Sequence, residues 1–307
     1  MRYFYALLFA CLFLHLHAKT MSIDSNFERK IYTDVDTVIV NCDIEEFKHH
    51  IIECFPNVRF YGCGGNAPYI SDNGILMNKS RTCIYLSPSN YPYKNGKYKC
   101  GRGIKNISKF AFQQSETLCR IDLNNVNNID DGAFAMCKKL NEVRFRKSIN
   151  KIGRSAFAKC SSLKSVYIKN VDSLMCAAFV DCVELEELFI PSSHFVDTFC
   201  FLRCTGITKA VLPCCQYDAM TFGFSSPKLQ HLFFEGIPSY KNRSYFIVDS
   251  IPSNAVLHVK KGTIEKFRKM TYFSQFSKTR EYESISKSAF RRIKAGKPAE
   301  LVAFEED

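Results

Sequence analysis

Apolar residues in the middle of the chain recur with a period of about 22 residues. Most copies start with an Ala-Phe pair, have a small residue, usually cysteine, three positions after the phenylalanine, and close with an alternating apolar run. Successive phenylalanines lie 22, 23, 22, 22 and 21 residues apart, and they are Phe112, Phe134, Phe157, Phe179, Phe201 and Phe222. This period predicts a solenoid, because a coil so short buries its apolar face only by stacking on the next coil.

The two halves of a copy predict different local structures. In the third copy, Leu163, Val166 and Ile168 should lie on one side of a strand and Tyr167 on the other, because side chains alternate along a strand. Stacked copies should therefore form a parallel sheet. The Ala-Phe half carries small and helix-favouring residues, so we expect a short helical turn there, with the phenylalanines stacked in the core. A glycine such as Gly132 suits the tight corner before that turn.

The repeat resembles the BspA-like family of leucine-rich repeats, known from secreted and surface proteins of host-associated bacteria and some protists. The resemblance covers roughly residues 69–282 and includes a strand–turn–strand segment at 70–90 and a closing segment at 251–267. Pro191 and Pro213 follow strands, as they do in the family. The resemblance implies an α/β repeat solenoid, a right-handed coil with a parallel β-sheet on one face and short helical turns on the other.

Five segments follow from these patterns. They are a signal peptide at 1–18, an N-terminal cap with a β-hairpin insert at 19–103, six leucine-rich repeats of 21–23 residues at 104–240, a C-terminal cap at 241–283 and a basic tail at 284–307. The first segment has an early arginine before an apolar stretch that ends in Leu-His-Ala, which is typical of a cleaved secretory signal. No apolar run of about 18 residues follows in the sequence, so we predict no membrane span after this segment. We therefore expect a secreted or cell-surface protein.

The caps have weaker patterns than the repeats. Before the repeats, the expected elements are a strand, an amphipathic helix and a strand within 19–66, a hairpin at 74–86 and a surface loop at 87–102. After the repeats, the expected elements are strands at 245–248 and 256–259 and a helix at 264–270. Thr263 is placed to cap that helix.

The chain has 15 cysteines, and four of them share one repeat position: Cys137, Cys160, Cys182 and Cys204. That position needs a small apolar side chain, and buried free cysteine meets the need, so we expect a ladder of thiols. A disulfide between stacked coils, such as Cys182 with Cys204, stays open, because adjacent strands lie within disulfide range. Better disulfide candidates in an exported protein are Cys42, Cys54, Cys63, Cys83 and Cys100.

Motifs for catalysis and metal binding are weak. Cysteine and histidine are zinc ligands, so the candidates for a zinc site are Cys42, His49, His50 and Cys54. Their spacing matches no standard zinc motif. We interpret them as residues of a helix face. The sequence has no nucleophile elbow, HExxH or phosphate loop. We therefore predict no enzyme activity, no metal and no cofactor.

The formal net charge of +12 favours an anionic partner. No nucleic-acid-binding module is recognisable, so we do not expect specific binding of nucleic acid. In the tail, Ile285, Ala289 and Ile293 lie at helical spacing among basic residues. We expect a solvated helix packed on the C-terminal cap, and contact with a membrane or an anionic polymer is the alternative.

The family resemblance implies a binding surface rather than a catalytic site. We predict an exported, non-enzymatic leucine-rich-repeat protein that binds a protein ligand through the exposed face of its sheet. The ligand would be a host extracellular matrix or cell-surface protein, and the role would be adhesion. Two alternatives stay open, namely a structural spacer or decoy without a specific ligand, and an enzyme that uses the N-terminal segment.

One outward position of each strand gives the candidate site. Stacking should align these positions in a column of Asp122, Arg144, Tyr167, Phe189, Val211 and Phe233. The last four are apolar, and contiguous exposed apolar surface often marks an interaction site. The predicted binding residues are therefore Arg144, Tyr167, Phe189, Val211 and Phe233, with Arg144 orienting the ligand and a second outward column forming a polar rim. The alternative is that a loop or the C-terminal tail covers the apolar column.

Overall fold

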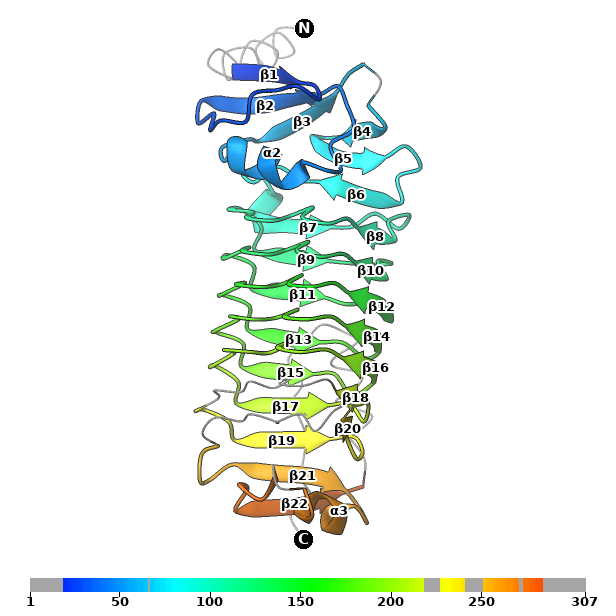
Figure 1. Ribbon diagram of the computed structural model, residues 1–307, viewed down its shortest axis with the longest axis vertical. Coiled ribbons are helices and arrows are strands. Elements are labelled where there is room, and N and C mark those ends of the chain that lie inside the picture. Colours follow the sequence, from blue (N-terminus) through cyan, green and yellow to red (C-terminus); the bar gives the residue numbers. More distant parts are fainter. Residues whose placement is uncertain (1–18, 66, 218–226, 241–250, 271–272, 284–307) are drawn as a thin grey trace, which may run out of the picture.

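The structure is a computed structural model that describes residues 19–65, 67–217, 227–240, 251–270 and 273–283. The predicted signal peptide and basic tail, the strand expected at 245–248 and the repeat residue Phe222 lie outside these residues. The described chain forms an elongated stack of coils with one cap at each end (Figure 1).

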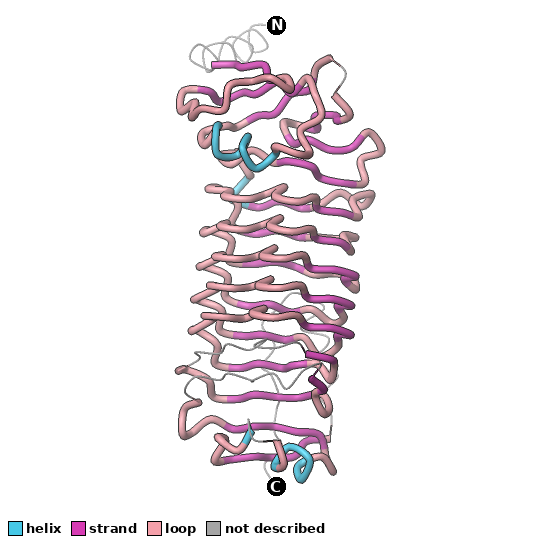
Figure 2. Tube along the Cα trace, viewed as in Figure 1, coloured by secondary structure: helices cyan, strands magenta, loops and turns pink. Residues whose placement is uncertain are grey.

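Two long sheets run along the stack, and the coils contribute strands to both (Figures 1 and 2). The nine-stranded sheet consists, in spatial order, of β7 (Lys97–Lys99), β9 (Arg120–Asp122), β11 (Glu142–Arg144), β13 (Ser165–Tyr167), β15 (Glu187–Phe189), β17 (Lys209–Leu212), β19 (His231–Phe234), β21 (Val256–Lys260) and β22 (Lys278–Tyr282). The ten-stranded sheet consists of β4 (Tyr69–Asp72), β5 (Ile75–Asn78), β6 (Cys83–Leu86), β8 (Asn106–Ile107), β10 (Asn128–Ile129), β12 (Ile149–Ile152), β14 (Val171–Leu174), β16 (Ser193–Val196), β18 (Gln216–Tyr217) and β20 (Ser239–Tyr240).

The nine-stranded sheet is the parallel sheet that the alternating runs predicted. Along β13, Val166 is buried, whereas Ser165 and Tyr167 on either side of it keep partial exposure. Parallel pairing places Val166 beside Leu188, and Leu188 beside Ala210. The predicted stacking of equivalent positions from coil to coil is therefore confirmed.

The ten-stranded sheet is a feature that the sequence did not predict. Its strand β14 has buried residues only at its ends, Val171 and Leu174. A spacing of three residues does not match the two-residue period of a strand, so the hydrophobic pattern gave no signal. Both residues belong to the same core cluster as Val166 of the nine-stranded sheet. The two sheets therefore enclose one continuous core.

The predicted phenylalanine ladder runs through this core. Successive ring centroids lie 5.0 Å apart from Phe112 to Phe179 and 5.7 Å apart between Phe179 and Phe201. The angles between neighbouring ring planes are between 1° and 12°. The rings of Phe134, Phe157 and Phe179 are thus each packed between rings of the coils before and after them, as the repeat period required.

The prediction of short helical turns in the Ala-Phe segments is wrong. In the second copy, Gly132 (φ +63°) and Met136 (φ +62°) have left-handed backbone on either side of the phenylalanine, and left-handed residues interrupt an α-helix. Alternate N–H groups of this segment also bond outside it. Phe134 donates to the carbonyl of Ala156, and Met136 donates to that of Ala158, each with an N···O distance of 2.7 Å. The N–H groups between them form single turns, as from Ala135 to the carbonyl of Gly132 (3.0 Å), so bonds to the next coil alternate with isolated turns and no continuous helix forms.

The N-terminal cap has its own sheet and its own core. Strands β1 (Lys19–Ile23), β2 (Val35–Val40) and β3 (Phe60–Cys63) form a parallel sheet, and helix α2 (Lys48–Cys54) accompanies them. The predicted strand–helix–strand order is confirmed, and so is the antiparallel hairpin of β5 and β6. The surface loop expected at 87–102 is wrong in part, because it contains the 3-10 helix η1 (Lys94–Gly96) and β7.

The C-terminal cap closes the other end. Strand β21 and helix α3 (Ile264–Arg268) lie where the sequence predicted a strand and a helix, while β22 was not predicted. Thr263 precedes α3, but its hydroxyl donates to the carbonyl of Lys260 (2.6 Å) and does not cap the helix. None of the helices in the described part of the chain is long and apolar enough to cross a membrane.

Candidate protein-interaction surface

The outward side chains of the nine-stranded sheet form two columns along the stack. Strand pairing aligns the first column, which consists of Lys99, Asp122, Arg144, Tyr167, Phe189, Val211, Phe233, His258 and Arg280. The second column consists of Lys97, Arg120, Glu142, Ser165, Glu187, Lys209 and His231. The predicted alignment of the candidate binding residues is confirmed, but the exposure of the first column changes along its length.

Phe189, Val211 and Phe233 are buried, which corrects the prediction that they form exposed surface. Their exposed fractions are 0%, 0% and 1%. The core-facing residues beside them are buried as well, so both sides of the strands are covered at these positions, while the outward residues Glu187, Lys209 and His231 keep partial exposure. Removing apolar surface from water is favourable by roughly 25 cal/mol per Å². A continuous run of apolar side chains is therefore more stable when another part of the molecule packs over it. In this structure the three residues are not open to a separate ligand.

Part of the cover over Phe233 comes from the C-terminal cap. The ring of Phe233 stacks on His258 of β21, with centroids 4.1 Å apart, and meets Tyr282 of β22 edge-on at 5.8 Å. Nε2 of His258 lies 3.0 Å from Nδ1 of His231. Burial, with the positive charges of His231 and Arg280, lowers the pKa of His258 to about 3. The ring of His258 is therefore neutral at pH 7 and packs as an aromatic residue.

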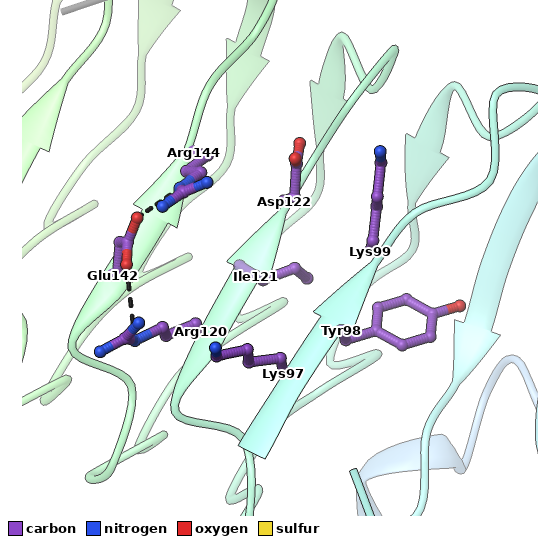
Figure 3. Close-up of a pocket in the computed structure, with 8 residues that line it drawn as sticks. All are labelled: Lys97, Tyr98, Lys99, Arg120, Ile121, Asp122, Glu142 and Arg144. Carbon is purple, nitrogen blue, oxygen red and sulfur yellow. Dashed lines mark hydrogen bonds and ion pairs between the residues drawn. The ribbon is translucent and has the colours of Figure 1, made fainter. Parts of the chain in front are cut away.

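At the opposite end of the stack the outer face is polar and hollowed (Figure 3). The hollow has a volume of about 240 Å³ and lies over β7, β9 and β11. Around Tyr98 and Ile121, its lining carries four cationic and two anionic side chains, namely Lys97, Lys99, Arg120, Arg144, Asp122 and Glu142. The excess of cations favours an anionic group as its ligand.

Glu142 holds the two arginines of the hollow. Its carboxylate pairs with Arg144 on the same strand and lies 3.5 Å from Nε of Arg120 on β9 (Figure 3). The two guanidinium groups share one carboxylate, so both keep N–H donors for a ligand. Lys97 and Lys99 are exposed, and within the described ranges neither forms an ion pair.

Asp122 contributes little negative charge to the hollow. Arg146 donates to its carboxylate from Nε (3.1 Å) and from Nη2 (2.7 Å). Burial is the largest single influence and raises the pKa of Asp122, but the hydrogen bonds from Arg146 and from the N–H of Asn124, together with the positive charges of Arg146 and Lys99, hold that pKa below its usual range. The carboxylate is therefore ionised and paired, and the remaining charge of the hollow is cationic.

Arg144 and Tyr167 are the predicted site residues that stay at the surface. Both are half-buried, and the hydroxyl of Tyr167 donates to the carboxylate of Glu187. Tyr167 marks the border between the polar end of the column and its covered apolar end. The structure adds Lys97 and Lys99, which the sequence placed in a loop. Their alternation with Tyr98 was the signal that could have indicated a strand.

The cysteine ladder lies in the core, as predicted. Its thiols are free and fully buried. Cys160 donates to the carbonyl of Phe134 (Sγ···O 3.1 Å), and Cys182 donates to that of Phe157 (3.2 Å). Burial raises the pKa of Cys137 to about 12, so its thiol stays protonated. Free thiols are also found at the positions proposed for disulfides, which are Cys42, Cys54, Cys63, Cys83 and Cys100.

The zinc ligands considered in the N-terminal cap do not converge on one point. His49 and His50 are neighbours on α2, with ring centroids 3.8 Å apart. Across the residues that the structure describes, no three His, Cys, Asp or Glu groups are placed to hold a metal ion. Burial is the largest cause of the raised pKa values of Cys42 and Cys54. Neither thiol is therefore poised as a thiolate nucleophile.

A protein-family model matches the part of the chain that carries the hollow. Six copies of the BspA type leucine-rich repeat region match residues 95–208. This part of the chain is a BspA-type leucine-rich repeat region. The match starts just before β7 and ends just before β17, so the hollow belongs to the first leucine-rich repeats of the stack. No curated protein matches the sequence at a significant level.

Two solved structures share the leucine-rich-repeat fold. The pneumococcal vaccine antigen PcpA is 16% identical, with a TM-score of 0.56, and the match covers 88% of this chain and 60% of that chain. A leucine-rich repeat protein from Eubacterium ventriosum is 18% identical, with a TM-score of 0.55, and the match covers 77% of this chain and 68% of that chain. The present chain thus spans about three fifths of the PcpA chain. At these identities the likeness concerns the fold alone.

Proposed function

We propose that this protein is exported, is not an enzyme, and binds a protein ligand through the polar outer face of β7 to β13. Its role would be adhesion to host matrix or cell-surface proteins. The observation that carries the proposal is the cationic hollow, in which Lys97, Lys99, Arg120 and Arg144 face outward from three adjacent strands. Tyr167 lies beside it on β13 as a half-buried aromatic residue, a type favoured in interfaces.

Three further observations support this function. The repeat family and the two structural matches are leucine-rich repeat or antigen proteins, which supports a surface location. The pattern of residues 1–18 supports export. The parallel strands hold the outward residues at fixed spacing, and such preorganisation lowers the entropic cost of binding.

Binding to a panel of immobilised extracellular-matrix and cell-surface proteins would test the proposal, with the purified full-length chain in solution. For any protein that binds, Arg144→Glu should weaken the affinity at least about tenfold, because a reversed charge in the hollow repels an acidic group. Lys139→Glu makes the same change of charge on an exposed turn and should bind as the unchanged protein does. Both variants should keep the melting temperature.

Two results would contradict the proposal. Equal affinity of the Arg144→Glu and Lys139→Glu variants would place the contact elsewhere on the molecule. Absence of saturable binding across the panel would favour the alternative of a spacer without a specific ligand.

A further inference from the structure

The outer face of the nine-stranded sheet is covered at one end and open at the other. Phe189, Val211 and Phe233 point outward from β15, β17 and β19 and are buried. Lys97 and Lys99 point outward from β7 and are exposed. Each coil passes from this sheet to the ten-stranded sheet and returns through its Ala-Phe turn (Figure 1). Among the described residues, the two sheets enclose the core, and the outer face of the nine-stranded sheet lies on the outside of the stack.

We propose that residues 284–307 dock on this outer face and run from β22 toward β7. The basic first part of the tail would cover the apolar column, and the acidic residues Glu305, Glu306 and Asp307 would occupy the cationic hollow. This contact within the chain goes beyond the proposed adhesive function and does not require it. Where that function holds, the tail competes with an acidic ligand for the hollow.

The tail is long enough to make this contact. Six strand steps separate β22 from β11, and adjacent strands lie about 4.8 Å apart, so the hollow begins about 29 Å from β22. Glu305 follows Tyr282, the last residue of β22, by 23 positions. As an α-helix, which rises 1.5 Å per residue, this segment would span about 35 Å, which reaches β11 and β9, while β7 with Lys97 and Lys99 lies eight strand steps or about 38 Å from β22 and is reached when part of the segment is extended. An extended segment would span more than that.

The charges of the tail and of the sheet face are complementary at two places, Glu187 and the cationic hollow, while Lys209 and Arg280 on the same face are cationic. The tail is basic between Lys287 and Lys297, and it ends with Glu305, Glu306 and Asp307. On the sheet, Glu187 of β15 lies four strand steps from β22, or about 19 Å. A helical tail would bring the basic stretch level with Glu187 and the acidic end level with the hollow. Opposite charges therefore meet at two separate places.

The apolar residues of the tail fit the covered part of the face. Ile285, Ala289 and Ile293 follow one another at intervals of four and would share one side of a helix. That side would lie over the column that includes Phe233 and Phe189. Contact between the two apolar surfaces would remove both from water, and this burial is favourable. Ion pairs at a surface contribute little by comparison.

Carbodiimide coupling of the full-length protein tests the contact directly, because it joins a carboxyl group to a lysine amine only when the two touch. We expect amide links between the segment 305–307 and Lys97 or Lys99. They should form in the monomer, with a yield that does not depend on protein concentration. The exposed control residues Lys138 and Lys139 should give no link to the tail. Links found only in dimers, or only to other lysines, would overturn the proposal.

Charge reversal tests the same contact without a crosslinker. Trypsin should cut after Arg291 faster in the Lys97→Glu/Lys99→Glu variant, by up to about fivefold for each ion pair lost. Adding Glu305→Lys/Glu306→Lys to that variant should restore the slow cleavage, because opposite charges face each other again. The control Lys138→Glu/Lys139→Glu should be cut at the rate of the unchanged protein. Equal cleavage rates in all four proteins would overturn the proposal.

Discussion

The ammonium group of Lys48 lies 2.9 Å from the hydroxyl of Ser108, which is sixty residues away along the chain. Lys48 belongs to α2 of the N-terminal cap, Ser108 follows β8 in the first coil, and both side chains are buried. The ammonium also pairs with Glu45 at 3.2 Å. Burial lowers the pKa of Lys48, and the carboxylate of Glu45 opposes that shift. The pair joins a cap with its own core to the repeats.

Substitutions of Lys48 and of Ser108 should lower the free energy of unfolding by different amounts. Ser108→Ala should lower the free energy of unfolding by about 1–2 kcal/mol, because it removes a partner from a buried cation. Lys48→Met should cost less, since it also removes the charge that burial disfavours. Urea denaturation of both single variants and the double variant measures the coupling, which should be near 1 kcal/mol. Strictly additive effects would show that the contact carries no energy.

Phe157 tests the ladder in the middle of the stack. Its ring lies 5.0 Å from those of Phe134 and Phe179, so Phe157→Ala should cost about 3–5 kcal/mol in the free energy of unfolding. The loss should spread to neighbouring coils, because each coil supports the next. Lys164→Ala, at an exposed position of the same coil, should change the value by less than about 0.5 kcal/mol. A Phe157→Ala variant with unchanged melting would show that the ring does not hold the stack together.

Thiol labelling should distinguish the ladder from the exposed cysteine. Cys214 is exposed and should react first with a thiol reagent in the folded protein. Cys137, Cys160, Cys182 and Cys204 should react only after denaturant is added, because burial excludes the reagent and raises the pKa of Cys137 to about 12. The Cys214→Ser variant should lose the fast phase. Mass spectrometry that finds the ladder cysteines joined in disulfides would contradict this account.

His258 should make the stability of the C-terminal cap depend on pH. Its pKa is about 3 in the folded protein against 6.5 ordinarily, so between these values the unfolded chain binds a proton that the folded chain does not. Stability should therefore fall as the pH decreases from about 6.5 toward 3, by at most about 1.4 kcal/mol for each pH unit. Urea denaturation at pH 7, 6 and 5 measures this slope before most carboxylates titrate.

The His258→Gln variant is the control for this slope, because glutamine can still bond to His231 but does not take up a proton. It should keep only the smaller dependence due to His231, whose pKa burial also lowers. Equal slopes for the variant and the unchanged protein would assign the effect to other groups.

The repeat positions by themselves determined the core. Phe157, Cys160 and Leu163 recur because each must meet its counterpart in the next coil, so the period alone indicates the stacking and the parallel sheet. The conformation of the Ala-Phe segment was not determined in this way. Its composition favours a helix, but the N–H of Phe134 bonds to Ala156 in the next coil. In this segment the hydrogen bonds between coils outweigh the preference of the residues for a helix.

The same distinction applies to the binding surface. Alternation along each strand determined that Phe189 and Phe233 point outward, because side-chain direction is a property of the local backbone. Only the tertiary structure decided that these outward-pointing side chains are buried. Phe233 is covered by His258 and Tyr282, which come from strands that follow it in the chain. Burial depends on which distant segments fold over a face, and the pattern within one strand carries no information about them.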